Sequence, residues 1–171
     1  DNHGTPVAGN ISGRINNSLG SSGLAPTTRV ASARTFISSL NCDGSWSSQS
    51  SWTVGALNFA QFIGARVTNN SNYYGFTSSA IADKYASTKA AGIVHFASAG
   101  NNGTSTLSYP SSLPSVNAVA ALDFSGLRAG FSQYGVGLDF SAPGVFIHST
   151  DRAGGDGYSG NDYAFVSGTS F

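Results

Sequence analysis

Three short stretches of the chain carry side chains that together could perform acyl transfer. That reaction needs a nucleophile, a base that takes its proton, and donors that stabilise the developing oxyanion. Ser170 in the Ser-Gly-Thr-Ser stretch is the candidate nucleophile, and His3 in the Asn-His-Gly-Thr stretch is the candidate base. Asn101, in an Ala-Gly-Asn-Asn-Gly turn, is the candidate oxyanion donor, because its side-chain amide can donate to a tetrahedral intermediate.

Each stretch taken alone has a simpler structural interpretation. A serine in such a stretch commonly forms a turn or a helix cap, His3 would suit an ordinary helix start with Pro6 in the first turn, and Asn101 suits a plain turn. His95 lies inside an apolar run and is expected in the core, whereas His148 ends an apolar run. The combination of the three stretches, in this order on one framework, is what favours catalysis.

The elements expected to position these residues alternate between strands and helices. Strand patterns at 30–36, 65–69 and 93–97 enclose helix patterns at 51–63 and 79–91. This alternation is typical of βαβ crossovers and a parallel sheet. Further strands are expected at 116–121 and 145–147, and no internal repeat or domain boundary interrupts the chain.

Both predicted helices should bury one apolar stripe and begin at a capping serine. Gly64 and Gly92 are the expected stops. The stripe residues are Trp52, Ala56, Phe59, Ala60 and Ile63 in the first helix, and Ile81, Ala82, Tyr85 and Ala86 in the second. Since ligands bind at the carboxyl ends of parallel strands, Ser71 and the Asn101 turn should meet at one edge of the sheet.

Composition narrows the classes of partner. The 171 residues carry zero formal net charge, and only 9% are charged. Without a basic stripe or a long apolar run, neither nucleic acid nor a membrane is an expected partner. Cys42 is the only cysteine, so no disulfide can form within these residues. It could pair outside them, stay a free thiol or act as a nucleophile, although nothing nearby in the sequence would lower its pKa.

The order of the three stretches, with the segments between them, resembles the subtilisin-like serine proteases (subtilases). The Gly-Leu-Ala-Pro turn before a strand, the Val-Thr-Asn-Asn-Ser strand and the Ser-Ala-Pro-Gly-Val segment extend the match. These and the other matching segments lie at 23–26, 67–71, 109–121, 131–135 and 141–145. The resemblance implies a three-layer α/β/α fold with a mostly parallel sheet, incomplete at both ends. Residues 1–171 would form part of a catalytic domain, from the histidine motif to the nucleophile.

The resemblance also implies roles for individual residues in a serine endopeptidase. His3 would be the general base and acid, Ser170 the acyl-forming nucleophile, and Asn101 the oxyanion donor together with the Ser170 N–H. A peptide or protein substrate would add as a strand beside Ser71, Asn72 and Tyr73. The facing pocket wall would comprise Ala97, Ser98, Ala99 and Gly100. Because these walls are uncharged, large apolar or generic side chains are the expected preference rather than Lys or Arg.

Several positions depart from the family pattern. Family order places the orienting aspartate well before the histidine, and Asp1 is too close to His3 for that role. The helix that would carry Ser170 is also missing after Phe171, so this polypeptide alone is expected neither to fold stably nor to cleave peptides. The alternative function is a catalytically inactive subtilase-fold binding protein. An α/β-hydrolase is disfavoured, since Gly-x-Ser-x-Gly is lacking.

The remaining expectations concern partners and ions. Composition and family habit suggest an extracellular, secreted protein that is monomeric. No cofactor is firmly predicted. Calcium is conceivable as a structural ion near Asp151, Asp156 and Asp162, although their Gly-rich stretch reads equally well as a solvated loop.

Overall fold

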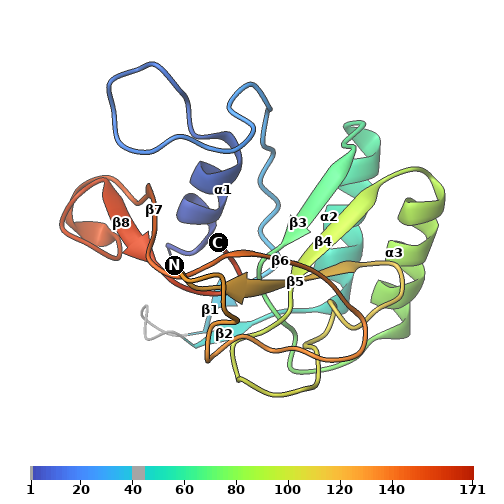
Figure 1. Ribbon diagram of the computed structural model, residues 1–171. Helices are drawn as coiled ribbons and strands as arrows, with labels where there is room; N and C mark the ends of the chain where they lie inside the picture. Colours follow the sequence, from blue (N-terminus) through green and yellow to red (C-terminus); the bar gives the residue numbers. More distant parts are fainter. Residues whose placement is uncertain (1, 40–44) are drawn as a thin grey trace.

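A four-stranded parallel sheet forms the centre of the computed structural model, which describes residues 2–39 and 45–171 (Figure 1). Its strand order is β3-β4-β5-β6. The strands are β3 (Val67–Asn70), β4 (Val94–Ser98), β5 (Asn117–Leu122) and β6 (Leu138–Pro143). The predictions of an α/β class and a parallel sheet are therefore confirmed. Those concerning Asp1 and Cys42 lie outside the described residues.

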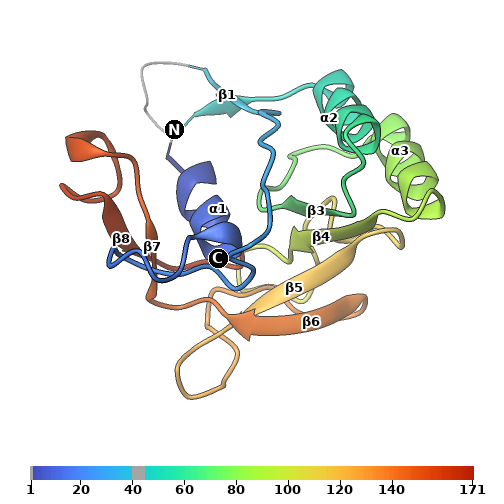
Figure 2. The ribbon, with the colours of Figure 1, turned by 90° about the horizontal axis from the view of Figure 1, so that it is seen from above.

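Two helices cover one face of this sheet. α2 (Ser50–Phe62) and α3 (Ser79–Ala90) lie side by side above β3 and β4 (Figure 2). Between helices and sheet lies a core cluster of buried residues: Leu57, Ile81, Tyr85, Ala97 and Val116. Within the described ranges, no helix has the length and apolar composition needed to cross a membrane.

The opposite face of the sheet carries exposed apolar side chains. Val67 and Val94 are directly paired in the register of β3 and β4 and are 55% and 45% exposed. Phe140 of β6 is also exposed, and its ring packs against Phe96 at 6.0 Å between centroids. Residues alternate between faces along a strand, which is why His95 and Ala97 of β4 point into the core while Val94 does not.

A second region joins the two ends of the described chain. α1 (Gly4–Ser12) packs against β7 (Ile147–Thr150), which forms an antiparallel hairpin with β8 (Tyr163–Val166). The hairpin loop contains a short 3-10 helix, η1 (Gly154–Asp156). Figures 1 and 2 both show α1 beside this hairpin and away from α2 and α3.

The strand predicted at 30–36 is absent. The chain is irregular there, and only β1 (Ile37–Ser38) follows, paired with β2 (Trp46–Ser47). A strand requires hydrogen-bonding neighbours, and none of the described strands pairs with 30–36. An aromatic contact holds the end of this irregular segment instead, since the Phe36 ring stacks on the Tyr74 ring with 5.1 Å between centroids.

The predicted helices form, but their buried faces differ from the expected stripes. α2 buries Thr53 and Leu57, whereas Phe59 and Ile63 are about 40% exposed or more. α3 buries Ile81 and Tyr85 as predicted, and adds Thr88 rather than Ala86. The face of α2 that packs on the sheet is therefore rotated about the helix axis from the face that carries its most apolar residues. Packing position, and not apolar content alone, therefore selects the buried face.

One cap and three strands differ from the sequence analysis. A serine side chain, Ser78, does cap α3, but α2 begins after Gln49 without a side-chain cap. β6 and β8 were not predicted, and the strand expected at 145–147 begins only at Ile147. Phe146 has a φ of 54°, a left-handed conformation that cannot continue a strand, and this delays β7.

Candidate active site

Ser170 lies in a turn four residues after β8 ends. Its hydroxyl donates to the Ser71 carbonyl at 3.0 Å, and the Ser71 hydroxyl donates back to the Ser170 carbonyl at 2.8 Å. Gly168, in the same turn, donates its N–H to the Gly144 carbonyl at 2.9 Å. The candidate nucleophile is thus tied directly to the segment that follows β3.

Asn101 is held by Thr169, a residue that the sequence analysis did not single out. The Asn101 Oδ1 atom accepts from both the N–H and the hydroxyl of Thr169, each at 2.9 Å. The Thr169 hydroxyl in turn accepts from the Gly100 N–H at 3.2 Å. Because the oxygen of the amide accepts two hydrogen bonds, the Nδ2 atom remains as its donor end. A Cβ placed on Gly168 would lie 3.4 Å from that nitrogen.

His3 immediately precedes α1, as the sequence predicts. Its half-buried ring lies against Phe171, with 5.3 Å between ring centroids and a 58° tilt. Desolvation by burial lowers the pKa of His3 below the usual value of 6.5. Burial therefore favours the neutral imidazole, which is the form able to take a proton.

Ser71, Asn72 and Tyr73 follow β3, the edge strand of the sheet. Asn70, the last residue of β3, holds this segment through hydrogen bonds of its side chain. Its Nδ2 donates to the Asn72 carbonyl at 2.8 Å, and its Oδ1 accepts from the hydroxyls of Tyr74 and Tyr85 at 3.3 Å each. An amide side chain ending a strand beneath a helix is the one sequence signal that could have identified Asn70.

The predicted pocket wall lies at the carboxyl end of β4, where all four of its residues are buried: Ala97, Ser98, Ala99 and Gly100. The Ala99 carbonyl accepts from the Ser108 N–H and the Gly100 carbonyl from the Gln133 N–H, both at 2.9 Å. Gly100 has a φ of 114°, and a Cβ there would overlap the Gln133 side chain. Hydrogen bonds thus hold the backbone of this segment, and glycine is required at position 100.

The structure brings the separate candidate segments together. Asn101 is bonded to Thr169, the neighbouring Ser170 is bonded to Ser71, and the adjacent Phe171 contacts His3. The segments after β3 and β4 meet at one sheet edge, as expected for adjacent parallel strands. Such an arrangement places a hydroxyl, an imidazole and an amide donor around one turn.

The other two histidines have structural surroundings. His95 is fully buried, with Nδ1 2.7 Å from the Thr68 hydroxyl and Nε2 3.0 Å from that of Thr88. Burial lowers its pKa to about 4. The prediction of a core histidine is confirmed. His148 lies on the exposed side of β7, where its ring contacts those of Tyr163 and Phe165.

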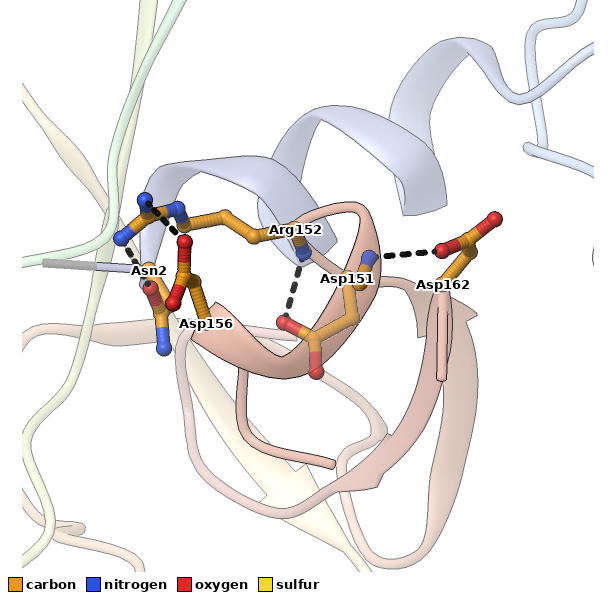
Figure 3. Close-up of polar contacts among 6 residues, drawn as sticks. Asn2, Asp151, Arg152, Asp156 and Asp162 are labelled. Atoms are coloured by element: carbon orange, nitrogen blue, oxygen red, sulfur yellow. Dashed lines mark hydrogen bonds and ion pairs between the residues drawn. The ribbon is translucent and has the colours of Figure 1, made fainter. Parts of the chain in front are cut away.

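The three aspartates considered for calcium serve the hairpin loop (Figure 3). Asp151 accepts from the N–H groups of Arg152 and Ser159, and Asp162 accepts from the Gly154 N–H at 2.9 Å. Asp156 forms an exposed ion pair with Arg152 at 3.6 Å. In the part of the chain that the structure describes, no three His, Cys, Asp or Glu residues gather to hold a metal ion.

Comparison with known proteins places these features in a family. Residues 1–171 match the subtilase family, Peptidase S8. The chain is 37% identical over 168 residues to Subtilisin Savinase of Lederbergia lenta, covering 98% of this chain and 57% of that protein. It is 40% identical over 172 residues to a thermophilic serine proteinase of Bacillus sp. strain AK1, covering 99% of this chain and 39% of that protein.

Solved structures show the same likeness in three dimensions. The self-cleaved protease domain of PatA aligns with a TM-score of 0.80 at 27% identity, covering 99% of this chain and 61% of that one. The subtilisin-like protease Apa1 of Pseudoalteromonas sp. AS-11 aligns with a TM-score of 0.76 at 29% identity, covering 97% and 42%. The chain spans between about two fifths and three fifths of these proteins. By its sequence over all 171 residues and by its fold, it belongs to the subtilase family.

Proposed function

We propose that the protein containing this chain is a serine endopeptidase, with Ser170 as nucleophile, His3 as general base and acid, and Asn101 as oxyanion donor. The observation that carries the proposal is the pair of hydrogen bonds that Thr169 donates to the Asn101 side-chain oxygen, beside the Ser170–Ser71 contact. It sets an amide donor and a serine hydroxyl around the same turn. The aspartate that orients His3 comes from outside these 171 residues.

The reaction follows from these positions. His3 takes the hydroxyl proton of Ser170 as the Ser170 oxygen attacks the scissile carbonyl carbon, and the carbonyl oxygen becomes an oxyanion. Asn101 Nδ2 and the Ser170 N–H donate to that oxyanion. His3 then gives the proton to the leaving amine, which breaks the C–N bond and leaves an acyl-enzyme. Water, deprotonated by His3, attacks the ester carbonyl, and His3 returns that proton to the Ser170 oxygen as the ester C–O bond breaks.

In the substrate-free structure the Ser170 hydroxyl donates to the Ser71 carbonyl, so it must rotate towards His3 before attack. A substrate peptide that adds as a strand along Ser71, Asn72 and Tyr73 presents its own N–H groups to these carbonyls. Substrate binding therefore competes for the acceptor that holds the hydroxyl. The uncharged wall at 97–100 suits large apolar or generic side chains before the cut. A monomeric, extracellular protein remains our expectation.

The test uses the full-length protein with a fluorophosphonate probe and a peptide amide substrate. The unaltered protein should label and hydrolyse, while Ser170→Ala should do neither. Asn101→Asp keeps an oxygen to accept from Thr169 but removes the donor, so kcat should fall by about 10²–10³-fold with an unchanged melting temperature. On the acid side kcat/KM should fall as His3 becomes protonated, because only the neutral imidazole can take the hydroxyl proton.

The inactive binding protein is the alternative outcome. A folded full-length protein that binds peptides but is neither labelled at Ser170 nor able to hydrolyse an amide would establish it. If the Ser170→Ala variant were still labelled, Ser170 would not be the nucleophile.

A further inference from the structure

Three contacts join the β7 strand and its loop to the start of α1 and to the residue before His3. The Ser149 hydroxyl donates to the Pro6 carbonyl at 2.7 Å, and the Thr150 hydroxyl donates to the Thr5 carbonyl at 3.0 Å. Arg152 Nη1 then donates to Asn2 Oδ1 at 3.3 Å, beside His3, a contact that Figure 3 shows. We call these three pairs the α1 seam.

The α1 seam is tightly packed and not a loose surface contact. Ser149 is completely buried. Gly9 of α1 faces the same two hydroxyls, and a Cβ on Gly9 would lie 2.8 Å from Ser149 Oγ and overlap Thr150 Oγ1. The helix therefore approaches the strand as closely as its backbone allows. The donors fix both its distance and its rotation, because hydrogen bonds are directional and apolar contacts are not.

The same hairpin also holds the nucleophile. β8 pairs with β7 from Ile147↔Val166 to Thr150↔Tyr163 and then runs directly into the turn of Ser170. At its base the Phe146 N–H donates to the Ser167 hydroxyl at 3.0 Å, and Gly168 is bonded to Gly144. One two-stranded unit thus connects the helix that begins after His3 with the turn that contains Ser170.

We propose that the β7–β8 hairpin sets the register between His3 and Ser170, with Ser149 and Thr150 as positioning residues that act through the Thr5 and Pro6 carbonyls. This inference rests on the proposed function and adds residues that do not contact substrate. Proton transfer requires base and nucleophile within hydrogen-bond reach, so a small shift of α1 slows the chemical step. Residues 71–73 take no part in the contacts of the α1 seam, so substrate binding there should be little affected.

The experiment measures kcat and KM in the full-length protein, with the concentration of active enzyme counted by fluorophosphonate titration. Thr150→Val preserves the shape of the side chain and deletes the donor, whereas Thr150→Ser retains the donor and deletes a methyl group. We expect about a tenfold fall in kcat for Thr150→Val and for Ser149→Ala, with KM within about twofold of the unaltered value. Thr150→Ser should restore most of kcat.

A matched control removes the same kind of bond elsewhere. The Ser87 hydroxyl donates to the Lys84 carbonyl of α3 at 3.0 Å, far from the hairpin, and Ser87→Ala should leave kcat unchanged. A purely structural seam would lower the melting temperature of Thr150→Val and Thr150→Ser while kcat per titrated site stayed constant, and that result overturns the proposal. Should Ser149→Ala fail to fold, the Thr150 pair decides alone. If the unaltered protein itself neither labels nor hydrolyses, the proposed function fails instead.

Discussion

The two halves of the molecule are held together by different forces. Beneath α2 and α3, large apolar and aromatic side chains such as Ile81 and Tyr85 are almost completely buried against the sheet. Between α1 and the β7–β8 hairpin, the buried apolar side chains are smaller, Ala164 and Val166 among them, and buried hydroxyl-to-carbonyl hydrogen bonds lie beside them, with Ser149 at the centre. Packing contributes stability without fixing direction, whereas hydrogen bonds fix direction. The half that contains His3 and Ser170 therefore depends on polar geometry, and the helical half supplies the core.

Ile81→Ala should have the largest effect on stability of the variants that distinguish the two halves. Ile81 is fully buried in the core cluster, and its truncation should lower the free energy of unfolding by about 2–5 kcal/mol. Urea unfolding of the full-length protein measures this, while kcat per titrated site should stay constant. Phe62, on the same helical half but 87% exposed, provides the control, since Phe62→Ala should change stability by less than about 0.5 kcal/mol. A fall in kcat for Ile81→Ala would show that the halves are coupled.

His95 makes the stability of the helical half depend on acid, and this dependence should be the larger of those from the two histidines whose pKa burial lowers, because the pKa of His95 is lowered to about 4. The unfolded chain binds a proton at the ordinary histidine pKa of 6.5, whereas the buried native side chain does so only near 4. The contribution of His95 to the free energy of unfolding is therefore fully present above pH 6.5. It falls by about 3 kcal/mol as the pH is lowered towards 4. Unfolding by urea at pH 7, 5.5 and 4 measures the slope, and His95→Gln should flatten it. An equal slope in that variant would assign the loss to other groups.

The exposed ion pair between Arg152 and Asp156 should show the smallest effect. Solvent screens both charges, so Asp156→Asn should change the free energy of unfolding by less than about 1 kcal/mol and leave kcat unaltered. Thermal melts at low and high salt provide the measurement. A larger loss, removed by salt, would mean that the charge on the loop, and not the buried hydroxyls, holds the hairpin against α1.

Much of the site could be predicted because it lies where parallel strands end. The patterns at 65–69 and 93–97 located two strands, and adjacent parallel strands bring the residues that follow them, Ser71 and Asn101, to the same edge. The residues that hold these groups were missed. Thr169 and Asn70 act through partners 68 and 15 positions away in the chain, in Asn101 and Tyr85, which no local pattern reveals.

The sequence by itself determined the α/β alternation, the start of α1 after His3, the core position of His95 and the resemblance to subtilases. These could be predicted because local periodicity, capping and motif order are properties of residues close together in the chain. Only the tertiary structure decided which face of α2 is buried, that residues 30–36 form no strand, and that Ser149 and Thr150 bind α1. These outcomes depend on which distant segment supplies the packing surface or the hydrogen-bond partner, and that choice is made only when the chain folds upon itself.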